Sequence, residues 1–402
     1  MTKRLHFAFI IFIISFVFGN GLMYGQEQEG KGTEEITLTL NFNQPKAYGL
    51  ESTGSNAEIL ETKFKVQDIT VSLGGHIAVY TGVNKYLRLD GVYSSNWGYI
   101  QINAPETDKI TTVCITTVKN NKESKINVIY NDINKKTTIK NNSTESFNKL
   151  DATEITLKAV ENTNAYISQL TITYTREKLD AAFDEKDDNV AAAISAVTGN
   201  GKDVSINRIF NCNYLNTACF PFDLSYDNIK EIFGNGTTIY TYAESKDDEI
   251  SFVSIKSDIK AGTPFIIKPE YYVEQPTFSD VTIESITPGK TGGSIAICGT
   301  ISPYKMNTDG SELFLQSDST LAKPAEGKNK MRGFRCYIKT NANEAQMPTA
   351  FFDGNTNDIR QTLQEKRQAS GLYSITGIKE RKDIMPFLHG IFIIDGKKFF
   401  IK

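Results

Sequence analysis

The chain has 402 residues, of which 40% are hydrophobic and 23% are charged, so it can bury more than one apolar core. Its formal net charge is −3 at pH 7, and no segment gathers lysines and arginines into a strip, which argues against nucleic acid as a partner. The five cysteines are too few and too scattered for a disulfide framework, and their odd number leaves at least one thiol unpaired.

The first 25 residues have the pattern of a secretory signal peptide. Lys3 and Arg4 precede an apolar run over residues 7–18, Gly19, Asn20 and Gly21 follow it, and the expected cleavage point is after Gly25, although Met23 does not match the small residue usual two places earlier. A helix over that run reaches about 18 Å, short of the ~30 Å hydrocarbon core, so removal of the segment is favoured over a permanent anchor. We therefore expect residues 1–25 to direct export and the remaining chain to act at the cell surface or outside the cell.

Residues 33–175 carry apolar side chains at every second position in many short runs, beginning with Ile36, Leu38 and Leu40. Glycine, asparagine and proline separate the runs. Alternation with a period of two predicts half-buried antiparallel strands, and two such sheets cover their apolar faces by packing together. We expect a β-sandwich over residues 33–175.

Residues 176–201 break this pattern. The acidic run 184–188 leads into an alanine-rich segment at 190–194 that suits one or two helical turns. The run lacks the spaced carboxylates and the glycine of a calcium loop, so we interpret residues 176–201 as a solvated acidic linker.

Strand patterns return over residues 202–352 and predict a second β-sandwich module. A short helix is the exception. Ser225 is placed to cap it, Ile229, Ile232 and Phe233 share its apolar face, and Gly234 is placed to end it. Residues 353–370 are expected to form another linker.

Both modules resemble parts of known exported proteins. In the second module, four segments in this order resemble a module common in large exported proteins of Bacteroides and Prevotella: 216–222, 259–269, 299–303 and 332–338. Such modules accompany leucine-rich repeats, Ig-like domains or glycan-processing enzymes, so the resemblance implies a location and neighbours more than an activity. The first module is similar to jelly-roll domains of the same proteins, which resemble carbohydrate-binding modules, through residues 86–105 and 167–174.

The segment 371–402 resembles the end of a Bacteroidetes carboxyl-terminal sorting domain, through residues 371–377 and 389–402. The resemblance implies contact with type IX secretion machinery at the envelope. Asp395 and Gly396 suit a type I′ turn, which predicts a β-hairpin at the end of the chain. The alternative is a shortened relic that only caps the fold.

Motifs for catalysis are missing from the sequence. It contains no His-Glu-x-x-His site, no Gly-x-Ser-x-Gly elbow, no Walker loop and no Cys-x-x-Cys pair, and beyond the leader only His76 and His389 remain. The 47 acidic residues leave room for a glycosidase pair, but such a pair is defined by a distance that sequence does not display. We interpret the chain as a protein without catalysis, metal site or cofactor.

The best candidate binding site is an aromatic cluster in the first module. Alternation puts Ile100 and Ile102 on one face of a strand and Trp97, Tyr99 and Gln101 on the other. Exposed rings beside polar donors suit sugar recognition, because the apolar face of a pyranose stacks on an aromatic ring while its hydroxyls take hydrogen bonds. The alternative is that Trp97 packs under a loop or at a domain interface. Additional ligand contacts are predicted from Tyr93, Arg88 and Asp90.

Two further features are predicted from short patterns. Cys212 and Cys219 flank a polar segment and suit either a disulfide across a hairpin or two buried thiols. Ser319, within Asp318-Ser319-Thr320, matches the short motif that Bacteroidetes use for O-glycosylation.

The sequence as a whole predicts an all-β protein of two tandem jelly-roll-like β-sandwich domains followed by a terminal β-hairpin segment. The function that we expect is an exported cell-surface binding or adhesion protein, with a polysaccharide or host glycan as its partner. The alternative is a structural or scaffolding envelope protein, or an accessory module of a glycan-degrading system.

Overall fold

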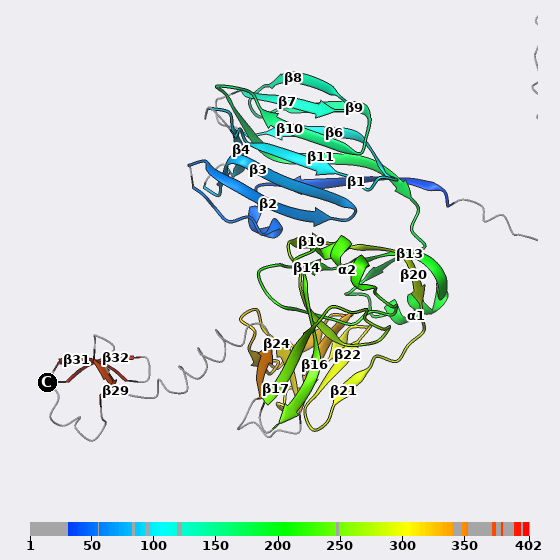
Figure 1. The fold of residues 1–402 in the computed structure, drawn as a ribbon, viewed down its shortest axis with the longest axis vertical. Helices are drawn as coiled ribbons and strands as arrows, with labels where there is room; N and C mark the ends of the chain where they lie inside the picture. The colour runs from blue at the N-terminus through cyan, green and yellow to red at the C-terminus, as the bar shows by residue number, and fades with distance from the viewer. Residues whose placement is uncertain are drawn as a thin grey trace, which may run out of the picture. The chain divides into compact units, whose positions relative to one another are not determined.

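The computed structural model describes residues 31–54, 56–82, 85–92, 96–118, 123–246, 249–340 and 348–352, together with the backbone of short strands between 372 and 401. β-Strands dominate these ranges, so the prediction of an all-β protein is confirmed (Figure 1). None of the described helices is long and apolar enough to span a membrane. The expected signal segment lies outside the described residues.

The first sandwich is built from β1 to β11 around one apolar core. The strand order is β8-β7-β10-β5-β3-β4-β11-β6-β9, with β1 beside β11 and β2 beside β3. Leu38, Ile102 and Ile172 are each at most 5% exposed, which confirms the alternation read from the sequence. The elements are β1 (Thr33–Asn41), the 3₁₀ helix η1 (Pro45–Tyr48), β2 (Glu58–Val66), β3 (Ile69–Tyr80), β4 (Tyr86–Asp90), β5 (Tyr99–Asn103), β6 (Lys109–Thr117), β7 (Ser124–Tyr130), β8 (Ile133–Ile139), β9 (Thr144–Ala152), β10 (Glu154–Ala159) and β11 (Asn164–Glu177).

The long strand β3 changes partner part of the way along its length. Residues 70–74 pair with β5, and residues 77–80 pair with β4. Because β4 also pairs with the start of β11, it links the two layers of the sandwich at a corner. Gly74 and Gly75 stand at the change of partner, next to the strand that carries the predicted aromatic site.

The second sandwich consists of two five-stranded sheets, β15-β18-β16-β17-β28 and β21-β22-β27-β24-β25. Phe252 and Ile266 from the first sheet pack with Ile297 and Leu313 from the second. The strands of these sheets are β15 (Asn216–Ala218), β16 (Thr238–Lys246), β17 (Glu249–Ile255), β18 (Phe265–Lys268), β21 (Lys290–Gly292), β22 (Ala296–Thr300), β24 (Glu312–Leu315), β25 (Leu321–Ala322), β27 (Arg335–Lys339) and β28 (Thr349–Phe352).

A smaller sheet, β12-β13-β20, and two short helices surround a separate phenylalanine-rich core. In the helix α2, Ser225 Oγ accepts a hydrogen bond from Asn228 N at 3.1 Å, and Ile229, Ile232 and Phe233 are buried, so the predicted capped helix is confirmed. The remaining elements of this module are β12 (Ala181–Asp184), α1 (Val190–Ala196), β13 (Gly199–Asn207), β14 (Ile209–Phe210), α2 (Tyr226–Phe233), β19 (Tyr272–Glu274), β20 (Thr277–Ile283), β23 (Tyr304–Lys305) and β26 (Lys330–Met331).

The four segments that carry the Bacteroides-type resemblance meet at this core. Cys219 N donates to Phe334 O at 3.3 Å, Phe334 N donates to Ile301 O at 3.0 Å, and Gly262 N donates to Phe220 O at 2.7 Å. Backbone hydrogen bonds therefore tie together segments that are far apart in the sequence. The residue types in these motifs serve packing and backbone pairing within the module.

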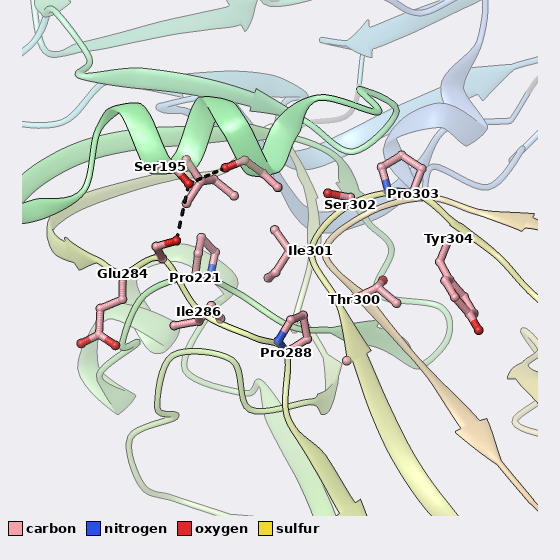
Figure 2. A pocket seen from close by; sticks show the side chains of 14 residues that line it. Ser195, Pro221, Glu284, Ile286, Pro288, Thr300, Ile301, Ser302, Pro303 and Tyr304 are labelled. Carbon is pink, nitrogen blue, oxygen red and sulfur yellow. Dashed lines mark hydrogen bonds between the residues drawn. The ribbon is translucent and has the colours of Figure 1, made fainter.

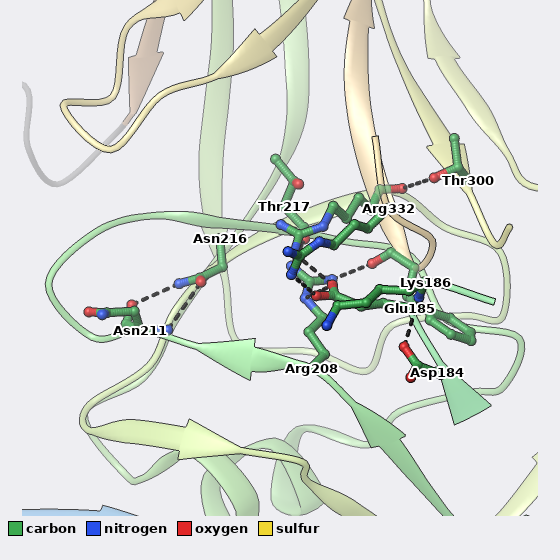
Figure 3. A network of polar contacts seen from close by, with 11 residues as sticks. Asp184, Glu185, Lys186, Arg208, Asn211, Asn216, Thr217, Thr300 and Arg332 are labelled. Atoms are coloured by element: carbon green, nitrogen blue, oxygen red, sulfur yellow. Dashed lines mark hydrogen bonds and ion pairs between the residues drawn. The ribbon is translucent and has the colours of Figure 1, made fainter. Parts of the chain in front are cut away.

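The segment 176–201 differs from the solvated linker that its composition predicts. β12 pairs in parallel with β13, and Val190 and Ile194 of α1 are buried. Glu185 is 3% exposed because arginines from a distant part of the chain surround its carboxylate (Figure 3). An acidic run read as solvent-facing thus contributes an internal ion pair.

Cys212 and Cys219 do not form the disulfide that the sequence left open, and of the alternative pair of buried thiols only Cys219 is fully buried. Cys212 packs beside Gly49 at the edge of the first core, whereas Cys219 is buried in the second core, where its Sγ donates to Gly262 O at 3.3 Å. Burial raises the pKa of the Cys219 thiol to about 12. The two sulfurs therefore belong to different cores and do not face each other.

A strand of the second module extends the first sheet. β19 pairs in parallel with β2, with Tyr272 opposite Phe64, and Gln67 N donates to Glu274 O at 2.7 Å. Tyr272 is 2% exposed and belongs to the core of the first module, with its ring centroid 6.1 Å from that of Tyr48. The two modules thus share both a sheet and a core side chain.

Strand pairing at the carboxyl end agrees with the predicted hairpin. β31 (Gly390–Ile394) pairs antiparallel with β32 (Lys397–Ile401) and also with β29 (Leu372–Ser374), which pairs with β30 (Lys379–Glu380). The predicted turn residues Asp395 and Gly396 lie outside the described residues.

Candidate functional site

The outward face of β5 carries the aromatic cluster that the sequence predicts. Ile100 and Ile102 are fully buried in the core of the first module, while Tyr99 and Gln101 are half-buried on the opposite face. Trp97 lies just before the strand, half-buried, with part of its ring packed against the edge of the same core. The predicted facing of this strand is confirmed.

The Tyr99 ring lies across a glycine on the neighbouring strand. Gly74 of β3 is the cross-strand partner of Tyr99, and a Cβ added there would stand 2.2 Å from the phenol oxygen. The missing side chain at Gly74 makes room for the ring against the sheet. Glycine and an aromatic ring across a strand pair are known to complement each other in this way. The result is a flat ring lying along the outer surface of the sheet.

Gly75 and Gly98 position Trp97 through close backbone approach. Gly75 has φ +78°, and a Cβ there would meet Trp97 O at 2.3 Å. A Cβ at Gly98 would meet His76 O at 2.3 Å. Because both contacts are to backbone atoms, neither position has space for a side chain. The two glycines therefore allow the backbone of Trp97 to lie close to β3, which sets the position of its side chain.

Lys158 completes the face and was missed by the sequence analysis. It is the cross-strand partner of Tyr99 on β10, and its Nζ lies 5.6 Å from the centre of the Trp97 ring. The same register places Thr156 opposite Gln101. A cation over an indole ring is a favourable contact and adds a hydrogen-bond donor. No periodicity within one strand reveals this neighbour, because the register between β5 and β10 is a tertiary property.

Arg88 and Asp90 lie on β4 and bind each other. Arg88 Nη2 is 3.0 Å from Asp90 Oδ2, and Asp90 Oδ1 accepts from Val92 N at 3.0 Å. Asp90 is 3% exposed, so it serves mainly to orient Arg88 and the start of the following loop. Gly98 N donates to Asp90 O at 2.9 Å, which brings the end of β4 next to Trp97. The predicted contact Tyr93 lies outside the described residues.

Three tyrosines form a separate aromatic cluster at the corner formed by β3, β4 and β11. Tyr80 and Tyr86 are cross-strand partners whose rings stack at 4.9 Å, and Tyr166 meets Tyr86 edge-on at 5.5 Å. Burial raises the pKa of the Tyr86 hydroxyl, so this phenol stays protonated and able to donate a hydrogen bond. In the sequence, Tyr80 and Tyr86 flank a short turn. This pattern is common in hairpins and does not by itself predict an aromatic cluster.

A pocket in the second module offers different chemistry (Figure 2). It has a volume of about 350 Å³ between α1 and residues 299–304, with Ile194, Pro221 and Pro288 among its apolar lining. Ser195 Oγ donates its hydroxyl hydrogen to Ala191 O of the same helix at 2.9 Å. Glu284 is the one acidic side chain among the described residues that line it. This lining suits a small apolar group better than acid–base chemistry.

Metal binding and covalent modification concern other parts of the described chain. Within them, no group of three or more His, Cys, Asp and Glu side chains is placed to hold a metal ion. Ser319 lies at the tip of the β24–β25 hairpin with φ +66°, beside Thr320, whose Oγ1 donates to Asp318 Oδ1 at 2.6 Å. O-glycosylation of Ser319 stays a prediction.

Comparison with known proteins adds no family. No family model matches the chain, and no curated protein matches it. Among solved structures, it is similar to a mycobacterial arabinofuranosyltransferase, AftD, at 10% identity and TM-score 0.20, covering 78% of this chain and 28% of that one. Clostridium perfringens ZmpB, in a structure of two CBM32 domains and an M60 catalytic domain, matches at 8% identity and TM-score 0.15, covering 86% and 39%.

Momordica charantia 7S globulin matches at 9% identity and TM-score 0.12, covering 61% of this chain and 86% of that one. The chain spans less than half the length of the first two of these proteins. At such TM-scores the likenesses support no argument about fold or activity.

Proposed function

We propose that this chain is a non-catalytic binding protein that holds a carbohydrate on the outward face of β5. The observation that supports this proposal is the pair of aromatic side chains Trp97 and Tyr99, each positioned by a neighbouring glycine, with Gln101 on the same strand as Tyr99 and Lys158 over the Trp97 ring. A sugar ring stacks on such a surface, the amide of Gln101 accepts hydrogen bonds from its hydroxyls or donates to them, and the ammonium of Lys158 donates to them. The ligand class is a polysaccharide or host glycan.

The proposed place of action is the cell surface of a Bacteroidetes-type bacterium or the surrounding medium. This part of the proposal rests on the signal-peptide pattern of residues 1–25 and on the resemblance of residues 371–402 to a type IX sorting domain. In that setting the chain acts as an adhesin or as an accessory module of a glycan-degrading system.

Glycan-array binding of the purified protein tests the proposal. We expect Trp97→Ala and Tyr99→Ala each to weaken binding at least tenfold, which corresponds to about 1.4 kcal/mol of lost stacking. Tyr226→Ala is a matched control, because Lys230 Nζ lies 4.9 Å from the Tyr226 ring in the second module and forms a similar cation–aromatic pair. Binding that both site variants retain in full removes the proposed platform.

A structural or scaffolding role is the second candidate, and the shared sheet of the two modules favours it. The pairing of β19 with β2 and the insertion of Tyr272 into the first core suit a stiff spacer that carries load. This candidate is preferred if the array detects no glycan and the envelope changes its mechanical or barrier properties when the gene is deleted.

A further inference from the structure

A second pocket of the second module lies between the β24–β25 hairpin, β26 and the start of β27 and has a volume of about 350 Å³. Its lining combines two kinds of residue. Five are apolar, namely Met306, Phe314, Leu315, Pro324 and Met331. Four are basic, namely Lys328, Lys330, Arg332 and Arg335.

Around these basic residues, the described positively charged groups outnumber the negatively charged ones. The carboxylate of Glu185 accepts from Arg332 Nη1 at 2.7 Å and from Arg335 Nη2 at 2.6 Å, and it lies 3.8 Å from Nε of Arg208 (Figure 3). Lys330 is matched separately by Asp188 at 2.8 Å. One buried carboxylate therefore faces three guanidinium groups within the described part of the chain.

The fully buried Arg208 strengthens this imbalance. Its guanidinium donates to Phe334 O and to Thr217 O, and Thr217 itself lines the pocket. Burial, together with the positive charge of Arg335, lowers the pKa of Arg208 well below its usual range. Burial is the larger of the two causes, and the charge of Arg335 acts in the same direction.

Several donors of these basic residues remain available to a ligand. A guanidinium has five N–H groups, and Arg332 and Arg335 each use one Nη toward Glu185. Arg335 Nε has no hydrogen-bond partner among the described residues, although the atom itself is buried. Lys328 is exposed and makes no ion pair with any described residue. Forked guanidinium groups match the geometry of carboxylate, sulfate and phosphate oxygens.

We propose that this pocket binds a small ligand bearing an oxyanion, a carboxylate, sulfate or phosphate group, on a compact body that packs against the methionine and phenylalanine side chains of the lining. The arginines hold the anionic group, whose negative charge compensates their excess positive charge. The apolar residues of the lining contact the ring or chain of the ligand. The pocket volume suits a single acidic sugar residue or an ion of similar chemistry. The site is distinct from the aromatic face of the first module, so the two proposals succeed or fail separately.

Isothermal titration calorimetry at low ionic strength tests the proposal with defined probes. These are sodium glucuronate, N-acetylglucosamine 6-sulfate, glucose 6-phosphate, inorganic phosphate and inorganic sulfate, with glucose as the neutral control. We expect at least one oxyanion to bind and glucose not to bind at this site, with affinity falling as salt rises. Binding of the sugar anions alone identifies an acidic saccharide as the source, whereas binding of the inorganic ions alone identifies a free ion.

Two variants assign any binding to this pocket. Arg332→Gln leaves Glu185 with Arg335 and Arg208, and Arg332 is 54% exposed, so the variant should fold. We expect it to weaken oxyanion binding at least tenfold, and Lys328→Gln to weaken it several-fold. Lys256→Gln, an exposed lysine elsewhere in the same module, should change nothing.

Circular dichroism melting verifies that each variant is folded. Lys328→Gln keeps the test valid even if Arg332→Gln unfolds, because Lys328 forms no ion pair with the described residues that the substitution would break. The proposal is overturned if no oxyanion binds, or if binding is the same in Lys328→Gln and in every folded Arg332→Gln sample as in the parent protein.

Discussion

At the scale of single residues, the glycine pair on β3 explains why the first module presents an aromatic surface. Gly74 makes room for the Tyr99 ring, and Gly75 allows the backbone of Trp97 to approach β3. Alternation alone predicted which way Trp97, Tyr99 and Gln101 face. It did not predict the role of the glycines or of Lys158, because those contacts depend on which strands become neighbours.

Replacing Gly74 by alanine tests whether the ring position matters. The new Cβ would overlap the far end of the Tyr99 side chain, which can swing away at little cost, and the backbone at Gly74 is not left-handed. We therefore expect a stability change below about 1 kcal/mol and a loss of glycan binding similar to that of Tyr99→Ala. Urea denaturation and the glycan array measure the two effects, and unchanged binding would contradict the assignment of Tyr99.

Replacing Gly75 by alanine should behave differently. Its φ of +78° and the contact with the Trp97 carbonyl leave no relaxation route except a backbone shift. We expect destabilisation of about 2 kcal/mol or more, read as a lower denaturation midpoint. A Gly75→Ala protein as stable as the parent would show that the close approach is not required.

Asp108 gives the first module a defined pH dependence. It is 4% exposed, and burial raises the pKa of its carboxyl to about 6, although Thr107 Oγ1 donates to it at 3.0 Å. The unfolded chain loses this proton near the ordinary value of 3.8, so the folded state binds more protons between the two values. Asp108 therefore lowers the free energy of unfolding as pH rises from about 4 to about 7.

Asp108→Asn should remove this contribution. We expect the variant to be more stable than the parent at pH values above about 7, by up to about 3 kcal/mol, with the difference vanishing below about pH 4. Urea denaturation at several pH values makes the comparison. If the free energy of unfolding changed with pH in the same way in both proteins, the titration of Asp108 would not contribute to the pH dependence.

At the scale of elements, long alternating strands and the capped helix α2 were predictable, but the segment 176–201 was not. β12 spans only Ala181–Asp184, too short for a clear period, and the acidic residues after it resemble a solvated run. What buries Glu185 is a set of arginines at 208, 332 and 335, which strand pairing brings together. The sequence shows only which charged residues are neighbours along the chain. Whether Glu185 is buried depends on arginines that are distant in sequence but close in the fold.

Glu185→Ala tests the importance of this contact. The substitution leaves Arg208, which has no exposed side-chain surface, without its counter-charge, so we expect a loss of about 3–5 kcal/mol in the free energy of unfolding. Asp188→Ala is the matched control, because its pair with Lys330 is well exposed and should contribute less than about 1 kcal/mol. Denaturant titrations compare the two, and equal losses would contradict the buried role of Glu185.

At the scale of the whole molecule, the sequence predicted two sandwiches but not the way in which they join. A three-residue strand, β19, pairs in parallel with β2, and no local pattern marks so short a segment. The sequence left open whether Trp97 packs under a loop or at a domain interface. Trp97 packs against the edge of the first core, and Tyr272 contributes to the contact between the modules together with the pairing of β19 and β2.

Tyr272→Ala should weaken the coupling between the modules. The ring fills space in the first core next to Tyr48 and Phe64, so its loss should cost about 3 kcal/mol and allow the modules to unfold at separate temperatures. Differential scanning calorimetry should resolve two transitions. Tyr214→Ala, at a side chain that is 37% exposed, should leave the thermogram unchanged, and a single transition in both variants would argue against coupling through Tyr272.

The pairing of β2 with β19 also protects the first sandwich from other molecules. An edge strand with unpaired N–H and C=O groups invites strands of other chains to add to it. A fragment that stops at Glu177 would leave residues 64–66 of β2 without this strand partner and an apolar hole where Tyr272 had been. Such a fragment should self-associate. The second module therefore helps to protect the first module from aggregation.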